Sequence, residues 1–485
     1  MYHAQRADAG RRLVVVANRM PVRWVGDGAD AGWQTSPGGL VSAIAPVLRA
    51  RQGSWVGWNG TAVDEEGSGE VRPFEHDGMR IYPIALTRDD LESFYHGFSN
   101  ETLWPLYHDA IRFPRFHRRW WWPYREVNER YARVAAGLAT DGADVWVHDY
   151  QLQLAPAMIR EMAPKARVGF FLHIPFPPEE LFAKMPWRRQ VLEGLLGADV
   201  LGFHTKLSAQ NFSRAARQFT SAKGSDYRLD YEGRRIVCKA FPISVDYKAI
   251  DELGGEDETA RMANRLRESL GGRRIILGVD RMDYTKGIDV RLRAFEDLLE
   301  TGRASADEVV LMQIAVPSRE SVGDYADLRR QVDEYVGRIN GRFASGGNAA
   351  VYYLYRGLPF NELVGAYRAA DVMMVTPFRD GMNLVAKEYC AARADGDGVL
   401  VLSEFAGAAL ELKQAMLVNP YDIDGMSAAL DRALRMEEEE RQRRMRSLRR
   451  TIAQHDVYRW ADSFLTELSH ASRKDSTRHE PALRA

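Results

Sequence analysis

Residues 371–388 read DVMMVTPFRDGMNLVAKE, and this stretch decides the fold of the chain around it. Its apolar part, VMMVTP (372–377), is typical of a buried strand, and the residues after Gly381 are typical of a helix. A helix start offers unpaired backbone N–H groups and positive partial charge, so it can hold an anion. The carboxylates of Asp380 and Glu388 could then bind hydroxyls. The stretch therefore predicts a strand-to-helix turn that binds a sugar nucleotide.

The same strand-and-helix alternation recurs along the chain. Short apolar runs bounded by polar or Gly/Pro residues are typical of strands, and the segments between them are long enough for crossover helices. These runs lie at 13–19, 145–150, 168–176, 200–205, 275–281, 309–316 and 399–405. The pattern predicts an α/β protein with parallel sheets, and it contains too many strands for one sheet.

A domain boundary is expected at FPISVDY (241–247), because a charged helical stretch follows it and a new alternation starts at Ile275. We therefore expect an N-terminal domain at 1–245 and a C-terminal domain at 246–455. A helix at 456–470 is expected to return to the N-terminal domain. Residues 471–485 are expected to form a disordered tail.

Composition narrows the class of protein. The chain is 45% hydrophobic and 27% charged, which is typical of a globular protein. Its length of 485 residues is expected to form two or three domains. The net charge of -1 gives no reason to expect a nucleic acid partner. Cys238 and Cys390 each lie in an apolar segment, which favours buried thiols in a reducing compartment. A polar N-terminus and the lack of a long apolar run predict a cytoplasmic protein that does not enter a membrane.

Two further stretches could hold phosphate at strand-to-helix turns. In SPGGL (36–40), Gly38 and Gly39 would let backbone amides approach an anion, although a tight turn needs the same glycines. In VDRMDYTKG (279–287), Arg281 and Lys286 follow a strand and could neutralise a diphosphate, unless they form surface ion pairs. The dinucleotide pattern GxGxxG and the P-loop pattern are absent from the sequence.

Arginines also follow strands elsewhere in the chain. Arg19 ends the first apolar run, and Arg319 follows AVPS (315–318). The guanidinium group forms a bidentate fork for phosphate, so a second phosphate site is conceivable. Either arginine could equally belong to an ordinary ion pair.

Aromatic stretches have two readings. Rings in GSWVGWNG (53–60) and FYHGFSNETLWPLYH (94–108) could stack on sugar faces or fill the core. RRWWWPYR (118–125) resembles a single-stranded nucleic-acid platform, but packing and cation–π contacts are favoured.

DGDGV (395–399) matches an aspartyl-phosphatase pattern in letters, yet it precedes its strand and is interpreted as a loop. His173 lies at the end of an apolar strand. It is either a core histidine or a residue beside a ligand.

Taken together, these stretches resemble the trehalose-6-phosphate synthases, retaining glycosyltransferases of family 20, and above all their actinobacterial members. The resemblance covers about residues 12 to 468 and implies the GT-B fold, two Rossmann-like domains facing across a cleft. The motifs that carry it occur in the family's order: ANRMPV, SPGGL, GFSNETLWPLYH, HDYQLQLAP, GFFLHIPFP, GLLGADVLGFHT, FPISVD, GVDRMDYTKG, AVPSR, GRINGRF, FRDGMNLVAKEY and LVLSEFAGAA.

The resemblance also implies roles for individual residues. Diphosphate binding falls to Arg281 and Lys286, with Asp149 and His173 beside the transferred sugar. The other donor-site residues would be Gly38, Gly39, Asp380, Gly381, Met382, Asn383, Leu384 and Glu388, the last on the ribose. The acceptor, glucose 6-phosphate, would be bound by Arg19, Trp58, Tyr95, Trp104 and Arg319. Trp55 is the alternative to Trp58.

The activity implied is transfer of glucose, with retention, from a nucleoside-diphosphate glucose to glucose 6-phosphate, giving α,α-trehalose 6-phosphate. GDP-glucose is slightly favoured over UDP-glucose on resemblance alone. No metal cofactor is expected, because fixed positive charge would stabilise the leaving diphosphate. A homo-oligomer is possible, and a separate trehalose-phosphate phosphatase is expected downstream. The alternatives are a pseudo-glycosyltransferase that couples cyclitols and a catalytically silent sugar-phosphate sensor.

Overall fold

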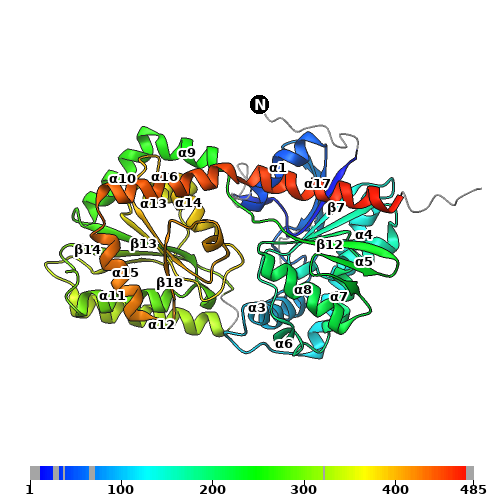
Figure 1. Cartoon of the computed structure of the whole chain (residues 1–485), viewed down its shortest axis with the longest axis horizontal. Helices are drawn as coiled ribbons and strands as arrows, with labels where there is room; N and C mark the ends of the chain where they lie inside the picture. The colour runs from blue at the N-terminus through cyan, green and yellow to red at the C-terminus, as the bar shows by residue number, and fades with distance from the viewer. Residues whose placement is uncertain (1–10, 26–31, 36–38, 65–71, 320–322, 477–485) are drawn as a thin grey trace, which may run out of the picture. The chain divides into compact units, whose positions relative to one another are not determined.

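The computed structural model describes residues 11–25, 32–35, 39–64, 72–319 and 323–476. Contacts between residues divide the chain into two compact units (Figure 1). Unit 1 is Met1–Ile243 with Tyr458–Ala485, and unit 2 is Ser244–Val457. The division therefore falls inside the FPISVDY stretch.

Unit 2 is built on a six-stranded parallel sheet. Across the sheet the strands are β15 (Val351–Leu354), β14 (Val309–Val316), β13 (Arg274–Arg281), β16 (Val372–Val375), β17 (Val399–Ser403) and β18 (Met416–Val418). The chain forms β13 in the middle of the sheet and then adds β14 and β15 towards one edge. It returns to the middle at β16 and adds β17 and β18 towards the other edge. In such doubly wound sheets, ligands bind beyond the carboxyl ends of the two strands where the winding reverses. In unit 2 those strands are β13 and β16.

Helices cover both faces of this sheet (Figure 1). On one face lie α11 (Ile288–Glu300), α12 (Gly323–Phe343) and α15 (Ile423–Leu434). On the other lie α9 (Tyr247–Gly255), α10 (Asp257–Ser269), α13 (Phe360–Ala369), α14 (Leu384–Ala392) and α16 (Glu438–Gln454). Short 3-10 helices are η4 (Tyr284–Lys286) and η5 (Gly407–Leu410).

Unit 1 carries a ten-stranded sheet with the same winding. In spatial order the strands are β10 (Lys223–Gly224), β11 (Arg228–Tyr231), β12 (Arg234–Ala240), β9 (Val200–Phe203), β8 (Arg167–Phe171), β7 (Asp144–His148), β1 (Leu13–Arg19), β4 (Ser54–Trp58), β6 (Met79–Ile84) and β5 (Phe74–His76). The strands from β12 to β6 are parallel, and β10, β11 and β5 add antiparallel edges. The winding reverses between β1 and β7. A separate hairpin joins β2 (Val22–Val25) to β3 (Gly32–Thr35).

The remaining helices belong to unit 1. They are α1 (Gly39–Ala50), α2 (Arg88–Asp90), the π-helix η2 (Leu91–Leu103), α3 (Trp104–Tyr107), α4 (Arg118–Leu138), η3 (Tyr150–Leu152), α5 (Ala155–Met162), α6 (Glu179–Phe182), α7 (Arg188–Leu195), α8 (Lys206–Phe219) and α17 (Val457–Ser476). The last helix extends past residue 471, where a tail was expected.

Helix α17 is packed directly onto the sheet of unit 1. The Phe464 ring stacks on Trp146 of β7, with 4.4 Å between ring centroids. A Cβ atom at Gly169 or Gly202 would lie 2.6 Å from the Phe464 ring or the Phe171 ring, respectively. Glycine on β8 and β9 thus leaves the space that these rings fill. The C-terminal helix is an integral part of the core of unit 1.

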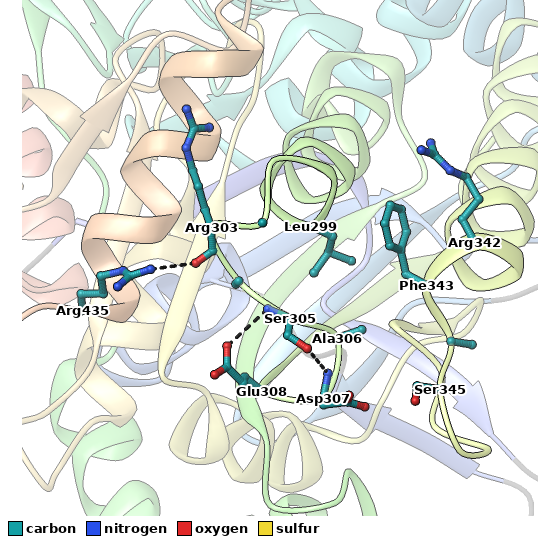
Figure 2. A pocket seen from close by; sticks show the side chains of 13 residues that line it. Leu299, Arg303, Ser305, Ala306, Asp307, Glu308, Arg342, Phe343, Ser345 and Arg435 are labelled. Carbon is teal, nitrogen blue, oxygen red and sulfur yellow. Dashed lines mark hydrogen bonds between the residues drawn. The ribbon is translucent and has the colours of Figure 1, made fainter.

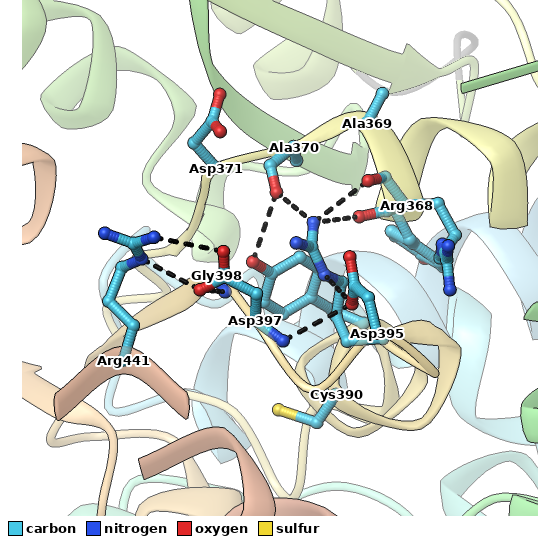
Figure 3. A network of polar contacts seen from close by, with 12 residues as sticks. Arg368, Ala369, Ala370, Asp371, Cys390, Asp395, Asp397, Gly398 and Arg441 are labelled. Carbon is cyan, nitrogen blue, oxygen red and sulfur yellow. Dashed lines mark hydrogen bonds and ion pairs between the residues drawn. The ribbon is translucent and has the colours of Figure 1, made fainter. Parts of the chain in front are cut away.

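The DGDGV loop has a structural role in unit 2 (Figure 3). It precedes β17, and its carboxylates bind two arginines. Asp395 Oδ1 accepts from Nε of the buried Arg393 at 3.0 Å, and Asp397 receives two bonds from Arg441, at 2.8 and 3.1 Å. Backbone carbonyls around Ala370 also accept hydrogen bonds from Arg393. The interpretation of this stretch as a loop is confirmed.

The predicted strands are confirmed, since each apolar run contains a strand of the two sheets. The strands not predicted are shorter or flanked by polar residues, such as β4, whose tryptophans are buried. RRWWWPYR opens α4, where the Trp120 and Trp121 side chains are buried and Trp121 stacks on Trp187. Packing is therefore the fate of most of these rings. Cys238 and Cys390 are buried free thiols, and burial raises the pKa of each to about 12.

Candidate active site

Predicted donor-site residues of unit 2 meet where its winding reverses. Arg281 is the last residue of β13, Lys286 ends η4 just after it, and Asp380 follows β16. The Lys286 ammonium lies 2.7 Å from Asp380 Oδ2, with both side chains largely buried. The Asn383 amide also donates to that oxygen, at 3.2 Å. These contacts hold the Asp380 carboxylate in one orientation beside a cation.

Helix α14 starts directly after this pair. Asn383 is its N-cap, with its side-chain oxygen accepting from the amide of Ala386 at 3.1 Å. The amides of Leu384 and Val385 lie in the first turn, where no carbonyl is available within the helix. The backbone from Asp380 to Met382 is held by η5, because Gly407 N–H donates to the Asp380 carbonyl at 3.2 Å and Ala408 N–H donates to the Met382 carbonyl at 2.8 Å. The predicted helix start is thus present, with Gly381 inside the fixed loop.

Glu388 lies on the same helix and is held from α13. The Tyr367 hydroxyl donates to its Oε2 at 2.9 Å. Burial raises the pKa of the Glu388 carboxyl, and the bond from Tyr367 opposes that shift. A carboxylate that is fixed and poorly hydrated is suited to accept hydrogen bonds from a diol such as a ribose.

Asp283 is a central residue that the sequence analysis did not single out. Its buried carboxylate lies 3.6 Å from Arg319 and 3.9 Å from Arg281, and it also accepts both the amide and the hydroxyl of Thr285 at 2.9 Å. Burial alone would raise the pKa of Asp283, but the charges of Arg319, Arg281 and Lys286 outweigh it and lower the pKa. The signal was present in the motif VDRMDYTKG, where one carboxylate stands between two cations.

Asp283 also joins residues that were assigned to different substrates. Arg281 was predicted to bind the donor and Arg319 the acceptor. Both arginines belong to unit 2 and bind the same carboxylate. Tyr325 completes the cluster, since Arg319 donates to its hydroxyl and the hydroxyl lies 3.4 Å from Asp283 Oδ2.

In unit 1, three predicted acceptor residues come together at the end of β1. Arg19 and Trp58 are partners across the β1–β4 pair, and the guanidinium carbon lies 4.0 Å from the centroid of the Trp58 ring. The Tyr95 ring is 6.1 Å from Trp58 and 6.0 Å from the same guanidinium. Gly60 has a φ of +104°, and a Cβ there would lie 2.2 Å from Arg19 Nη1. The exposed Arg19 side chain thus lies against aromatic rings and the backbone of Gly60.

Trp55 and Trp58 are both buried, but they make different contacts with Arg19. The Trp55 ring is buried, and its Nε1 donates to the Arg19 carbonyl at 2.9 Å. It supports the backbone of Arg19, whereas the Trp58 ring contacts the charged group. Of these two rings, Trp58 is the one that lies against the Arg19 guanidinium.

Tyr95 lies within an unusual element, and Trp104 lies just after it. Tyr95 is within the π-helix η2, and Trp104 follows its end, with its amide donating to the Ser99 carbonyl. π-Helical segments are rare and often mark functional sites. Trp104 is buried against His108 and Tyr150, with ring centroids 4.2 and 5.6 Å away. It contacts the residue that follows Asp149.

Asp149 and His173 are also neighbours in unit 1. Asp149 follows β7, the strand across the winding reversal from β1, and His173 follows β8. The backbone N–H of His173 donates to Asp149 Oδ1 at 3.2 Å. His148 and His204, which the sequence analysis did not single out, contact the His173 ring and carbonyl.

Three predicted site residues have backbone angles that L-amino acids rarely adopt. The φ angles are +73° at Asp149, +49° at Arg319 and +80° at Asn383. Such conformations cost of order 1–3 kcal/mol each and concentrate at functional sites. Of the glycine pair, Gly39 is the first residue of α1, and Gly38 lies outside the described residues.

A pocket in unit 2 lies away from these residues (Figure 2). It is lined by residues of the α11–β14 connection, Arg303 to Glu308, and by Arg342 and Arg435. The connection precedes β14, so the pocket is at the amino ends of the parallel strands, opposite Arg281 and Arg319. Each of the three arginines binds a carboxylate: Asp297, Glu296 and Asp431, respectively. The pocket is not part of the candidate site.

No group of three or more His, Cys, Asp or Glu residues within the described ranges is arranged to hold a metal ion. No helix of the described chain is both long and apolar enough to cross a membrane.

Comparison with known proteins places the chain among glycosyltransferases. The model of glycosyltransferase family 20 matches residues 11–470. Trehalose-6-phosphate synthase of Mycobacterium avium (strain 104) is 51% identical over 475 residues, covering 96% of each chain.

Solved structures extend the similarity to the fold. An α,α-trehalose-phosphate synthase (UDP-forming) from Burkholderia vietnamiensis has a TM-score of 0.87 at 38% identity, covering 96% of this chain and 98% of that one. A UDP-forming synthase from Burkholderia xenovorans in complex with glucose-6-phosphate has a TM-score of 0.86 at 37% identity, covering 94% and 99%.

Proposed function

The chain belongs to glycosyltransferase family 20, and from that premise we propose that it is a trehalose-6-phosphate synthase. Its two doubly wound units have the GT-B architecture expected from the sequence. The reaction proposed is transfer of glucose from a nucleoside-diphosphate glucose to glucose 6-phosphate, giving α,α-trehalose 6-phosphate. The observation that carries the proposal is the Lys286–Asp380 pair beside the start of α14, at the reversal point of a doubly wound sheet.

The donor would bind to unit 2. Arg281 and Lys286 would neutralise the diphosphate, together with amides at the start of α14. Asp380, fixed by Lys286 and Asn383, would accept hydrogen bonds from glucose hydroxyls. Gly381 to Leu384 would line the sugar and phosphates, and Glu388 would hold the ribose. Asp149 and His173 of unit 1 would bind the transferred glucose.

The acceptor is proposed to bind at the cluster formed by Arg19, Trp58 and Tyr95 in unit 1. The Arg19 guanidinium, stacked on Trp58 and close to Tyr95, offers donors for an anion and ring faces for a sugar. Arg319 of unit 2 would contribute a second cation for the acceptor phosphate. A synthase in complex with glucose-6-phosphate among the structural relatives supports this choice of acceptor.

The mechanism proposed is front-face displacement with retention. The bond between glucose C1 and the diphosphate oxygen breaks, and the acceptor hydroxyl forms the new C1–O bond on the same face. The leaving phosphate oxygen takes the acceptor proton, so no protein nucleophile is required. Fixed cations would stabilise the leaving diphosphate without a metal ion.

Two donors are proposed, each from a different resemblance. Similarity to actinobacterial synthases favours GDP-glucose slightly. The UDP-forming synthases among the solved relatives favour UDP-glucose. The product would be a phosphate monoester, and a separate phosphatase is proposed to hydrolyse it.

The test is to incubate purified protein and glucose 6-phosphate with UDP-, GDP- or ADP-glucose, each with and without EDTA. Trehalose 6-phosphate, identified by mass spectrometry and by the proton couplings of its two anomeric centres, is expected with GDP-glucose or UDP-glucose. Absence of product with every donor would refute the synthase proposal, and a β-linked product would refute retention. Loss of activity on chelation, restored by a divalent ion, would refute the metal-free mechanism.

A further inference from the structure

Three histidines stand side by side at the carboxyl ends of adjacent strands in unit 1. His148 ends β7, His173 follows β8 and His204 follows β9. The His173 ring centroid is 5.3 Å from that of His148 and 5.6 Å from that of His204. Trp460 of α17 borders the cluster, 6.1 Å from His173. Parallel strand pairing brings these rings together, because the three strands end at the same edge.

The backbone of His173 is held from two sides. His204 Nε2 lies 3.2 Å from the His173 carbonyl oxygen. Since a carbonyl only accepts, this nitrogen of His204 must carry the hydrogen. The N–H of His173 donates to Asp149 Oδ1 at 3.2 Å. Rotation of the peptide groups around residue 173 would break one of these bonds.

The ring of His173 is oriented by His148. His148 Nδ1 and His173 Nε2 are 3.1 Å apart, so one of the two donates and the other accepts. The other nitrogen of His148, Nε2, is buried and has no hydrogen-bond partner among the described residues. If His173 donated from Nε2, then His148 would accept at Nδ1. Neutral His148 would then carry its hydrogen on Nε2, where the N–H would be buried and unpaired.

An unpaired buried N–H is rarer in proteins than an unpaired acceptor. The better arrangement has His148 donating from Nδ1, which leaves only a lone pair on its buried Nε2. His173 then accepts at Nε2 and, as a neutral ring, carries its own hydrogen on Nδ1. No residue in the described part of the chain bonds to that Nδ1.

We propose that His148 and His204 are positioning residues that hold His173 as a neutral ring with its hydrogen on Nδ1, so that it donates to a hydroxyl of the transferred glucose. The proposal builds on the proposed function, which places His173 beside that sugar. Burial lowers the pKa of His148 to about 3. Burial and the neighbouring His148 and His204 also lower the pKa of His173. Both rings therefore stay neutral at physiological pH.

This arrangement has a consequence for donor recognition. A ring held with a hydrogen on Nδ1 can act only as a donor at that nitrogen, and it matches an acceptor such as a hydroxyl oxygen. In free histidine the hydrogen favours Nε2, which in this site is the nitrogen directed at His148. Without the bond from His148, the ring would offer a lone pair to the sugar for much of the time.

The direct test is the tautomer of His173 in the full-length chain. Histidine labelled with ¹⁵N would be followed by long-range proton–nitrogen correlation at neutral pH, and the His173 signals would be identified by their loss in a His173→Gln variant. The expected pattern is a protonated Nδ1 and an unprotonated Nε2. A protonated Nε2 on His173 would overturn the proposal, because His148 would then accept at Nδ1 and carry its own hydrogen on Nε2.

A kinetic test uses two variants of His148. The side-chain amide of Asn can replace the Nδ1–H donor, whereas Leu cannot. His148→Leu is expected to lower kcat/KM for the nucleotide sugar by about 5- to 10-fold, the worth of one hydrogen bond, with a smaller effect on the KM for glucose 6-phosphate. His148→Asn is expected to restore most of the loss. Equal losses in the two variants, or loss confined to the acceptor KM, would refute the positioning role.

The two measurements separate this inference from the proposed function. If no nucleotide sugar is a substrate, the proposed function fails, and the tautomer measurement still decides the arrangement of the histidines. If transfer occurs but His173 carries its hydrogen on Nε2, the synthase proposal stands and the positioning proposal fails.

Discussion

The carboxylate of Asp283 and the guanidinium of Arg319 form a buried ion pair, with Oδ2 3.6 Å from Nη1. Arg319 has a left-handed backbone conformation, and its side chain is only 5% exposed. The orientation of this arginine therefore depends on Asp283. Because Arg281 binds the same carboxylate, a change at Asp283 reaches both residues.

Asp283→Asn tests this dependence. The variant keeps the size of the side chain and removes the charge that orients the arginines. Without this ion pair Arg319 is less well oriented, so the KM for glucose 6-phosphate should rise about 10-fold or more, or about 1.4 kcal/mol. Initial rates at saturating donor give this value. Asp333→Asn, at a half-exposed carboxylate on α12, is the control and should be silent. An unchanged acceptor KM in Asp283→Asn would remove Arg319 from the acceptor site.

Lys286→Met tests stabilisation of the leaving diphosphate. Methionine keeps much of the volume and removes the ammonium that lies 2.7 Å from Asp380. Loss of one such group should lower kcat about 100- to 1000-fold, or about 3–4 kcal/mol in the barrier. Steady-state turnover is the measurement, and Lys248→Met at an exposed position of α9 is the matched control. Similar turnover in the two variants would contradict the assigned role.

Arg319→Ala separates the two substrates. The variant removes the proposed contact with the acceptor phosphate while leaving Arg281 and Lys286 in place. We expect the apparent KM for glucose 6-phosphate to rise far more than the KM for the nucleotide sugar. Both constants come from a two-substrate kinetic matrix. Equal effects on the two would move Arg319 out of the acceptor site.

Asp280→Ala tests the support beneath the donor site. Asp280 lies on β13 just before Arg281, and its carboxylate binds the fully buried Arg291 at 2.6 Å. Removing one partner of a buried pair leaves an uncompensated charge and costs about 3–5 kcal/mol. Urea unfolding should show this loss. Asp431→Ala breaks an exposed pair with Arg435 and should cost about 1 kcal/mol or less. Equal losses would mean that Arg291 finds another partner.

Stability should fall as the protein is acidified below about pH 6.5. Burial lowers the pKa of His148 from 6.5 to about 3 in the folded state. Between these values the unfolded chain binds one more proton at this residue, so the free energy of unfolding rises with pH. The stabilisation is complete above the unfolded pKa and is lost on acidification at about 1.4 kcal/mol per pH unit.

The measurement is urea unfolding at several pH values between 4.5 and 7, and it needs a variant to isolate His148. His148→Leu should unfold with a shallower dependence on pH than the original chain. Trp146→Phe changes packing in the same cluster without removing a titrating group, so it should keep the full dependence. An unchanged slope in His148→Leu would show that His148 is protonated in the folded protein.

The sequence predicts the framework of both units because central parallel strands are continuous apolar runs. Leu13–Arg19 and Val309–Val316 have the predicted bounds, since burial on both faces leaves only apolar residues between polar ends. Edge strands cannot be predicted in the same way, because they lack a long apolar run. β18 has three residues with an exposed Leu417, so its apolar signal is too short to recognise.

The sequence identifies candidate site residues at strand ends, but not the contacts that hold them in place. Arg281, Lys286 and Asp380 are recognisable because charged groups directly follow apolar runs. Asp283 and His148 act through contacts with residues distant in the sequence or on neighbouring strands, and one sequence does not contain those distances. The ring of Trp58, in contact with Arg19, could be separated from Trp55 only by the register of β1 against β4.

The packing of the Phe464 ring against Gly169 and Gly202 has a consequence for the order in which the protein folds during synthesis. The ribosome synthesises the first 243 residues long before it reaches α17, so the first unit leaves the exit tunnel without the helix that seals its sheet. All of the second unit is translated before that helix arrives. The half that is made first is therefore completed last.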